Sequence, residues 1–203
     1  MTHNAHMPVT ACIRERCDEC PVAGQVLCHH TPADLLDFGA LVITAWIPFF
    51  AGMIRGRYWW GLGIWFALAA VFFGVIEALI LCRHCPHYAE EGSTLRCHAN
   101  WGLPKLPKYD PRPLSKGERM AWLAYVAVLM LYGLPFLAAS GQWLLLAIHA
   151  WALFTAAWTI QRTQCTRCYV LTCPVNRMPE EVREQLGACY PFVVPDTNLI
   201  EPE

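Results

Sequence analysis

Four long apolar stretches constrain this chain more than any other feature of its sequence. They cover residues 37–54, 58–81, 120–139 and 143–160. Crossing the hydrocarbon core of a bilayer takes about 20 mostly apolar residues, and a spanning segment must satisfy its own backbone hydrogen bonds, which favours helices. The composition agrees, with 56% hydrophobic and only 15% charged residues. We therefore predict an all-α membrane protein with four transmembrane helices.

The segments between the stretches predict how the helices start and connect. Residues 55–57 alone separate the first two stretches and residues 140–142 alone separate the last two, so we expect two helical hairpins. Residues 31–34 (Thr-Pro-Ala-Asp) and 115–118 (Ser-Lys-Gly-Glu) have the spacing of capping boxes and predict helix starts. Prolines inside two of the spans predict kinks, and these are Pro48 and Pro135.

An even number of spans places three polar pieces of the chain on one side of the membrane. Residues 1–36, 82–119 and 161–203 hold 13 of the 15 Lys and Arg residues, seven of the eight His and all 11 Cys. Short loops rich in Lys and Arg stay in the cytosol. We therefore expect an integral membrane protein with both termini and all cysteines cytoplasmic. Its predicted parts are a cysteine-rich head, a hairpin, a loop, a second hairpin and a tail, with bounds 1–33, 34–81, 82–117, 118–161 and 162–203.

The cysteines are spaced like metal half-sites rather than at random. A C-x-x-C pair brings two thiolates onto one metal from a tight turn, and disulfides are not expected in a reducing compartment. Three such pairs occur, each with a third cysteine downstream: Cys17, Cys20 and Cys28; Cys82, Cys85 and Cys97; Cys165, Cys168 and Cys173. Two further cysteines, Cys12 and Cys189, lie outside these groups. The pattern predicts a metal-binding face built from both termini and the central loop.

The identity of the metal depends on what stands beside the cysteines. Three of them precede a proline, as a ligand cysteine does in bacterial ferredoxins, and this favours an iron–sulfur cluster. Zinc is the alternative, because mixed Cys/His ligation is typical of structural zinc. Histidines that could serve in this way are His29, His30, His84, His87 and His98.

The grouping of the ligands can also be predicted in part. Cys12, Cys17, Cys20 and Cys28 could close one four-thiolate site within the head. The other two groups have three cysteines each and need a fourth ligand. Because Cys82 follows the second span and Cys165 follows the fourth, we expect these groups to face each other at the end of the bundle. Ligands that could complete them are Cys189, His84 and His98.

Two ionisable residues lie inside spans, where such residues mark functional sites by default. They are Glu77 in the second span and His149 in the fourth. We expect them either to serve a proton path or quinone pocket near the metal, or to make polar contacts between helices.

One motif resembles the core of a known enzyme family. Arg83-His84-Cys85-Pro86, in a loop between the second and third of four spans, resembles part of the Asp-His-His-Cys-Pro core of the protein S-acyltransferases. The resemblance implies a nucleophilic Cys85. The chain departs from the pattern because Arg83 stands in place of an acid and only one histidine precedes the cysteine. The architecture also resembles, more loosely, that of membrane-bound ferredoxin-type proteins of respiratory chains.

These features lead to one preferred function and three alternatives. We expect a membrane-embedded iron–sulfur protein that carries electrons between a cytosolic partner and the quinone pool or a membrane complex, rather than a stand-alone enzyme. The alternatives are a zinc-stabilised scaffold, a metal sensor and a cysteine-based acyltransferase. Residues 98–114 could dock a protein partner, and Lys105, Lys108 and Arg112 could meet anionic lipid head groups. A net charge of −1 does not suggest nucleic acid.

Overall fold

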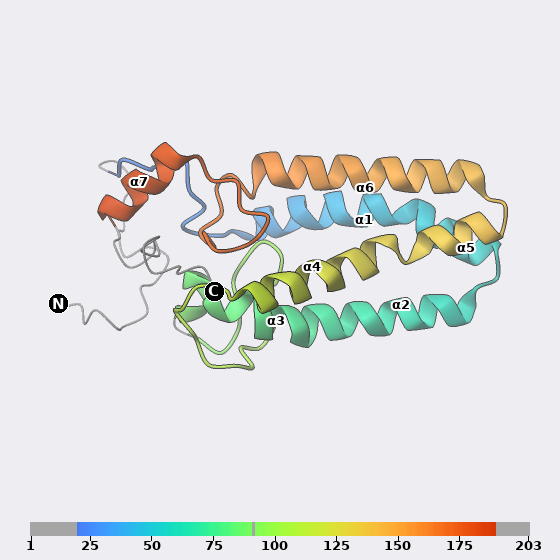
Figure 1. The fold of residues 1–203 in the computed structure, drawn as a ribbon, viewed down its shortest axis with the longest axis horizontal. Coiled ribbons are helices and arrows are strands. Elements are labelled where there is room, and N and C mark those ends of the chain that lie inside the picture. Colours follow the sequence, from blue (N-terminus) through green and yellow to red (C-terminus); the bar gives the residue numbers. More distant parts are fainter. Residues whose placement is uncertain (1–19, 91, 190–203) are drawn as a thin grey trace.

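A computed structural model describes residues 20–90 and 92–189, and this part contains four helical runs long and apolar enough to cross a membrane (Figure 1). The first run is α1 (Pro32–Arg55) and the last is α6 (Trp143–Thr163). The second run, Trp59–His84, consists of α2 (Trp59–Val71), the π-helical η1 (Phe72–Ile76), α3 (Glu77–Ile80) and the 3-10 turn η2 (Cys82–His84). The third consists of α4 (Lys116–Leu131) and α5 (Gly133–Ala139). The prediction of an all-helical protein with four helical runs that could span a membrane is confirmed for the described residues.

Two shorter helices lie outside the spans. They are the 3-10 turn η3 (Pro86–Ala89) and α7 (Glu180–Cys189). The predicted starts of the first and third spans are also confirmed, since both capping boxes are complete. The Asp34 carboxylate accepts from the Thr31 backbone N–H at 2.6 Å, and the Glu118 carboxylate accepts from the Ser115 backbone N–H at 2.9 Å.

The two prolines inside spans have different effects. Pro135 cannot donate a backbone hydrogen bond, and its ring conflicts with the carbonyl four residues earlier, which belongs to Leu131. The third span is interrupted at this point, because α4 ends at Leu131 and α5 begins at Gly133. The hydroxyl of Tyr132, between them, donates to the Gly61 carbonyl at 3.0 Å and ties the interruption to α2. At Pro48, by contrast, α1 continues without a break.

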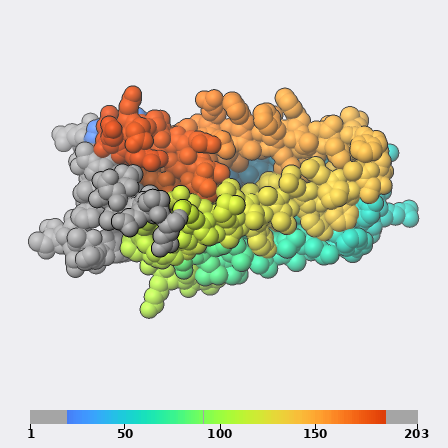
Figure 2. All heavy atoms as spheres, in the orientation of Figure 1, coloured from blue at the N-terminus to red at the C-terminus, as the bar shows by residue number. Residues whose placement is uncertain are grey.

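The four spans pack as two pairs that share an apolar core at the end with the short turns. α1 packs along α6, whereas α4 packs against α2 and α3. The shared core contains Trp46, Phe49, Met53, Leu62 and Trp65. Farther from the turns, a second core contains Phe72 with Trp122 and Leu129 on α4, and Val175 from the segment after α6 packs against it. Figure 2 shows the surface hollowed between α4 and α6 there, with α1 visible at the bottom of the groove.

The opposite end of the bundle collects the polar pieces of the chain, and we call it the cysteine end (Figure 1). The head joins the tail here, because the Leu27 N–H donates to the Arg167 carbonyl at 2.9 Å. A small core shared by head and tail consists of Val22, Val26, Tyr169, Met178, Val182 and Leu186. The loop after η3 folds back on itself through an isolated bridge between Thr94 and Pro104. The result is a compact cap on the end of the bundle.

Candidate metal centre at the cysteine end

Four thiols from three segments gather where the second span meets the cap. Cys82 begins η2 and Cys85 follows it directly, Cys97 comes from the loop, and Cys168 comes from the segment after α6. Cys82 lies within electrostatic range of Cys85 and Cys97, and the latter two lie within range of Cys168. We call these four residues the cysteine cluster. The predicted meeting of the second and third cysteine groups therefore occurs, through Cys168 rather than Cys165.

Burial keeps the thiols of this cluster protonated when no cation is present. It raises the pKa of Cys97 to about 11 and that of Cys168 to about 11, and it raises the pKa of Cys85 well above its usual value. Neighbouring thiols raise these pKa values further, because two thiolates close together repel each other. Without a bound cation, the thiols of Cys85, Cys97 and Cys168 are therefore neutral near pH 7.

The same sulfur atoms nevertheless accept hydrogen bonds from backbone amides. The Asn100 N–H donates to Cys97 Sγ at 3.2 Å, and the Val170 N–H donates to Cys168 Sγ at 3.5 Å. The amide of His87 donates to the thiol of Cys85 in the same way. Donors of this kind favour the negatively charged form of a group. The backbone is thus arranged to stabilise thiolates once a cation offsets the cost of burying them.

Asn100 connects the cluster to the buried carboxyl group of Glu77. Its side chain is 3% exposed, and its Nδ2 donates to Glu77 Oε2 at 2.8 Å and to Cys82 Sγ at 3.4 Å. Glu77 is itself only 7% exposed, and the Trp122 indole lies beside it. Glu77 therefore belongs to the surroundings of the cysteine cluster, as the sequence suggested. Asn100 was not predicted, because nothing in a polar loop residue shows that its side chain turns inward.

His84 is unavailable to the cysteines because both of its ring nitrogens are occupied. Nδ1 lies 2.9 Å from the Asp110 carbonyl, and Nε2 accepts from Arg83 Nε at 3.1 Å. Arg83 in turn pairs with Glu118 at 2.7 Å. This network fixes the loop to the start of α4. With both ring nitrogens occupied, His84 is free neither to bind a metal nor to act as a base for Cys85. The geometry therefore lends no support to the resemblance to S-acyltransferases.

The remaining predicted ligands are distributed around the cluster or lie outside the described residues. Cys165 and Cys173 interact with Cys168, and burial raises the pKa of Cys173 to about 12. Cys20 and Cys28 pack against the core that the head shares with the tail. Cys12 and Cys17 lie outside the described residues, so the predicted four-thiolate site of the head is described only in part. Cys189 ends α7, and its side chain is likewise outside the description.

The thiols are neighbours without being arranged around a single point. Among residues 20–90 and 92–189, no group of three or more His, Cys, Asp or Glu side chains is positioned to hold a metal ion. Four sulfurs bound to one zinc at about 2.3 Å would lie about 3.8 Å from one another. Loading a single ion would therefore require the thiols of the cysteine cluster to turn inward.

His149 does not share a site with Glu77. It lies six residues from the start of α6, about 9 Å along the helix, whereas Glu77 lies 18 residues, about 27 Å, from the start of the second span at the same end. His149 is fully buried, and its Nδ1 lies 3.1 Å from the Ala45 carbonyl on α1. Its ring packs against Trp46 and Phe49. This is the contact between helices that the sequence left open as the alternative to a quinone pocket.

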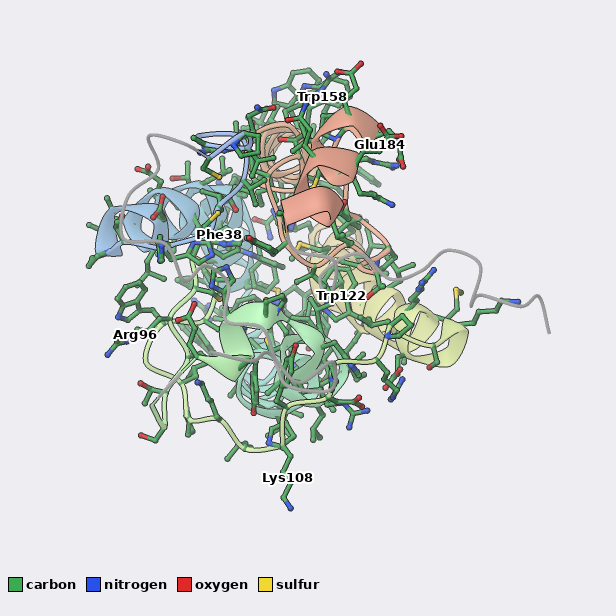
Figure 3. All side chains as sticks on the ribbon, turned by 90° about the vertical axis from the view of Figure 1, so that its left-hand side faces the viewer. Phe38, Arg96, Lys108, Trp122, Trp158 and Glu184 are labelled. Atoms are coloured by element: carbon green, nitrogen blue, oxygen red, sulfur yellow. The ribbon has the colours of Figure 1, made fainter. Side chains whose placement is uncertain are left out.

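The basic residues predicted to meet lipid head groups differ in whether acidic side chains of the protein already pair with their charges. Arg112 pairs with Asp110 at 2.9 Å and with Glu118 at 2.6 Å, so its charge is used within the protein. Lys108 is exposed and points outward from the cap in Figure 3, as does Arg96, which was not among the predicted residues. These two cations are available to an anionic surface or partner.

Comparison with known proteins finds no relative, since no family model, no curated protein and no solved structure matches the chain.

Proposed function

We propose that this chain is a membrane-embedded electron carrier whose iron–sulfur cluster is held by Cys82, Cys85, Cys97 and Cys168. The observation that carries the proposal is the gathering of four thiols, Cys82 buried and the other three partly buried, at the end of the second helical run. Three of the four accept backbone N–H donors. Hydrogen bonds to sulfur and the surrounding burial are among the means by which proteins set the potential of such clusters.

The residues beside the thiols favour an iron–sulfur cluster over a single zinc ion. Three of the cysteines, Cys85 among them, precede a proline, as a ligand cysteine does in bacterial ferredoxins. Cys165 and Cys173 lie next to Cys168 and could serve as alternative ligands during loading.

The place of the cluster in the fold supports a role in electron transfer at a membrane surface. The cap exposes one side to water and a soluble partner, with Lys108 and Arg96 on its surface. The groove between α4 and α6 opens toward the bilayer and gives a dissolved quinone an approach from the other side (Figure 2). We place the cysteine end in the cytosol, because 13 of the 15 Lys and Arg residues lie on that side.

Anaerobic purification followed by iron, sulfide and zinc analysis and visible spectroscopy tests the proposal. We expect a coloured protein whose iron content falls by the same amount in Cys97→Ser, in Cys168→Ser and in the double variant, because both residues serve one cluster. Cys28→Ser, in the head, should leave that cluster in place. Additive losses from the first two changes, or a protein without iron, would refute this assignment.

A zinc-stabilised scaffold is the second candidate, and one observation favours it. The cysteine cluster brings together the end of the second span, the loop and the segment after α6, as a structural zinc site that cross-links separate segments would do. A colourless protein with stoichiometric zinc that is lost in Cys168→Ser would establish this function in place of electron transfer.

A further inference from the structure

Three histidine rings from separate parts of the cap pack together beside the cysteine cluster. The ring centroid of His30, in the head, lies 4.5 Å from that of His87 in η3 and 5.1 Å from that of His98 in the loop. Phe38 on α1, labelled in Figure 3, contacts the His98 ring edge-on at 5.3 Å. We call His30, His87 and His98 the histidine cluster.

One ring of the histidine cluster is fixed by hydrogen bonds and positions the others. His87 Nδ1 lies 2.8 Å from Glu90 Oε1, and its Nε2 lies 3.1 Å from the Leu27 carbonyl. Both of its nitrogens therefore face acceptors, and neither is available as a ligand. His87 instead holds the head against η3, and its ring packs against that of His30.

The other two rings each have a buried nitrogen without a partner. The Nδ1 atoms of His30 and His98 are shielded from solvent and make no hydrogen bond. An imidazole that carries its proton on Nε2 offers a lone pair at Nδ1. Leaving a buried polar atom unsatisfied is unfavourable, and a metal ion would satisfy both of these neighbouring nitrogens.

We propose that His30 and His98 form a second metal site, separate from the cysteine cluster, that binds a first-row transition-metal ion through imidazole nitrogen. Neutral imidazole suits Zn²⁺, Cu, Fe and Ni ions, and Asp34 and Glu90 add negative charge nearby. Only two protein ligands are present, so water completes the coordination and the ion exchanges readily.

Titration of the full-length protein with Co²⁺ in detergent, followed by visible absorption, tests this site. Nitrogen and oxygen ligands give weak d–d bands, whereas thiolates add strong charge-transfer bands in the near ultraviolet, so the two kinds of site are read separately. We expect one equivalent of d–d absorption without charge transfer, lost in both His30→Gln and His98→Gln and retained in His29→Gln. His29 is a matched control because it precedes His30 and is exposed.

A second measurement keeps the proposal testable if a variant folds poorly. Because a ligand that binds only the folded state stabilises it, Co²⁺ should raise the melting temperature of the wild type and of His29→Gln by more than that of the other two variants. Equal Co²⁺ binding in all four proteins, or an ion bound only with thiolate charge transfer, would overturn the histidine site. A protein without iron would overturn the electron-transfer function and leave this result unaffected.

Discussion

The contact between Asn100 and Glu77 allows a quantitative test of how the cysteine cluster is held. The Asn100 side chain joins the loop to the second span through its bonds to Glu77 Oε2 and Cys82 Sγ. Asn100→Ala removes both bonds and leaves a buried carboxyl group without its donor. Stranding a buried polar group costs about 1–3 kcal/mol, so we expect the free energy of unfolding to fall by about 2–3 kcal/mol.

A double-mutant cycle separates this contact from the general loss of packing. Glu77→Ala, Asn100→Ala and the double variant are compared with the wild type by denaturant titration in detergent micelles. A bond to an ionised carboxylate contributes about 1.5–3 kcal/mol and a bond to a neutral one about 0.5–1.5 kcal/mol. The coupling energy therefore also reports whether Glu77 is charged in the folded protein.

Asn176 supplies the control for this cycle. Its Nδ2 donates to the Cys168 and Val170 carbonyls at 2.9 and 3.1 Å, and its Oδ1 accepts from the Met178 N–H at 3.0 Å. Asn176→Ala should destabilise the cap by a similar amount but show no coupling to Glu77. A coupling energy near zero between Asn100 and Glu77, with both single variants folded, would refute the contact.

Three further predictions concern the helices and the cap. Gly133→Ala places a methyl group 2.8 Å from Phe49 Cε2 and should lower the free energy of unfolding by about 1–3 kcal/mol. Gly63→Ala, whose methyl group meets open space, should not destabilise the protein. Thermal melts of the two variants test this difference. Glu118→Ala removes a capping partner and the ion pairs with Arg83 and Arg112, so we expect the free energy of unfolding to fall by about 1–2 kcal/mol. Glu118→Gln keeps an acceptor for Ser115 and should be less destabilised in the same denaturant titration. The metal-free protein should lose stability as the pH falls from about 6.5 toward 4. In the folded protein, burial lowers the pKa of His30 to about 3 and that of His98 to about 4, so both rings stay neutral over this range. The same rings become protonated in the unfolded chain, and this proton uptake favours unfolding. A double His30→Gln/His98→Gln variant should show a flatter pH dependence of its melting temperature, and an unchanged one would contradict the assignment.

The spans and their starts could be predicted because their causes are local in sequence. An apolar run of sufficient length is a helix in lipid whatever surrounds it. The capping boxes at Thr31 and Ser115 depend on residues three positions apart. The interruption before Pro135 follows from the ring of that proline, while the π-helical turn at Phe72–Ile76 has no comparable local signal in the sequence.

The cap could be predicted only as a set of cysteines, because its contacts join distant residues. Cys82 could be placed at the end of a span, and its meeting with the third cysteine group was anticipated. That Cys168 rather than Cys165 makes the contact depends on how the segment after α6 folds against the head, through Leu27 and Arg167. The inward turn of Asn100 and the meeting of His30 with His98 depend on the same packing.

The raised pKa values of the cysteine cluster bear on the order in which this protein assembles. Because burial keeps Cys85, Cys97 and Cys168 protonated, the cap can form beside the membrane without burying unpaired thiolates. Backbone N–H groups donate to the sulfur atoms of Cys97 and Cys168. Loading then replaces thiol protons with a cation, so it should be favoured by higher pH and should release protons to water. Folding first and loading second is therefore the order that the chemistry of these residues favours.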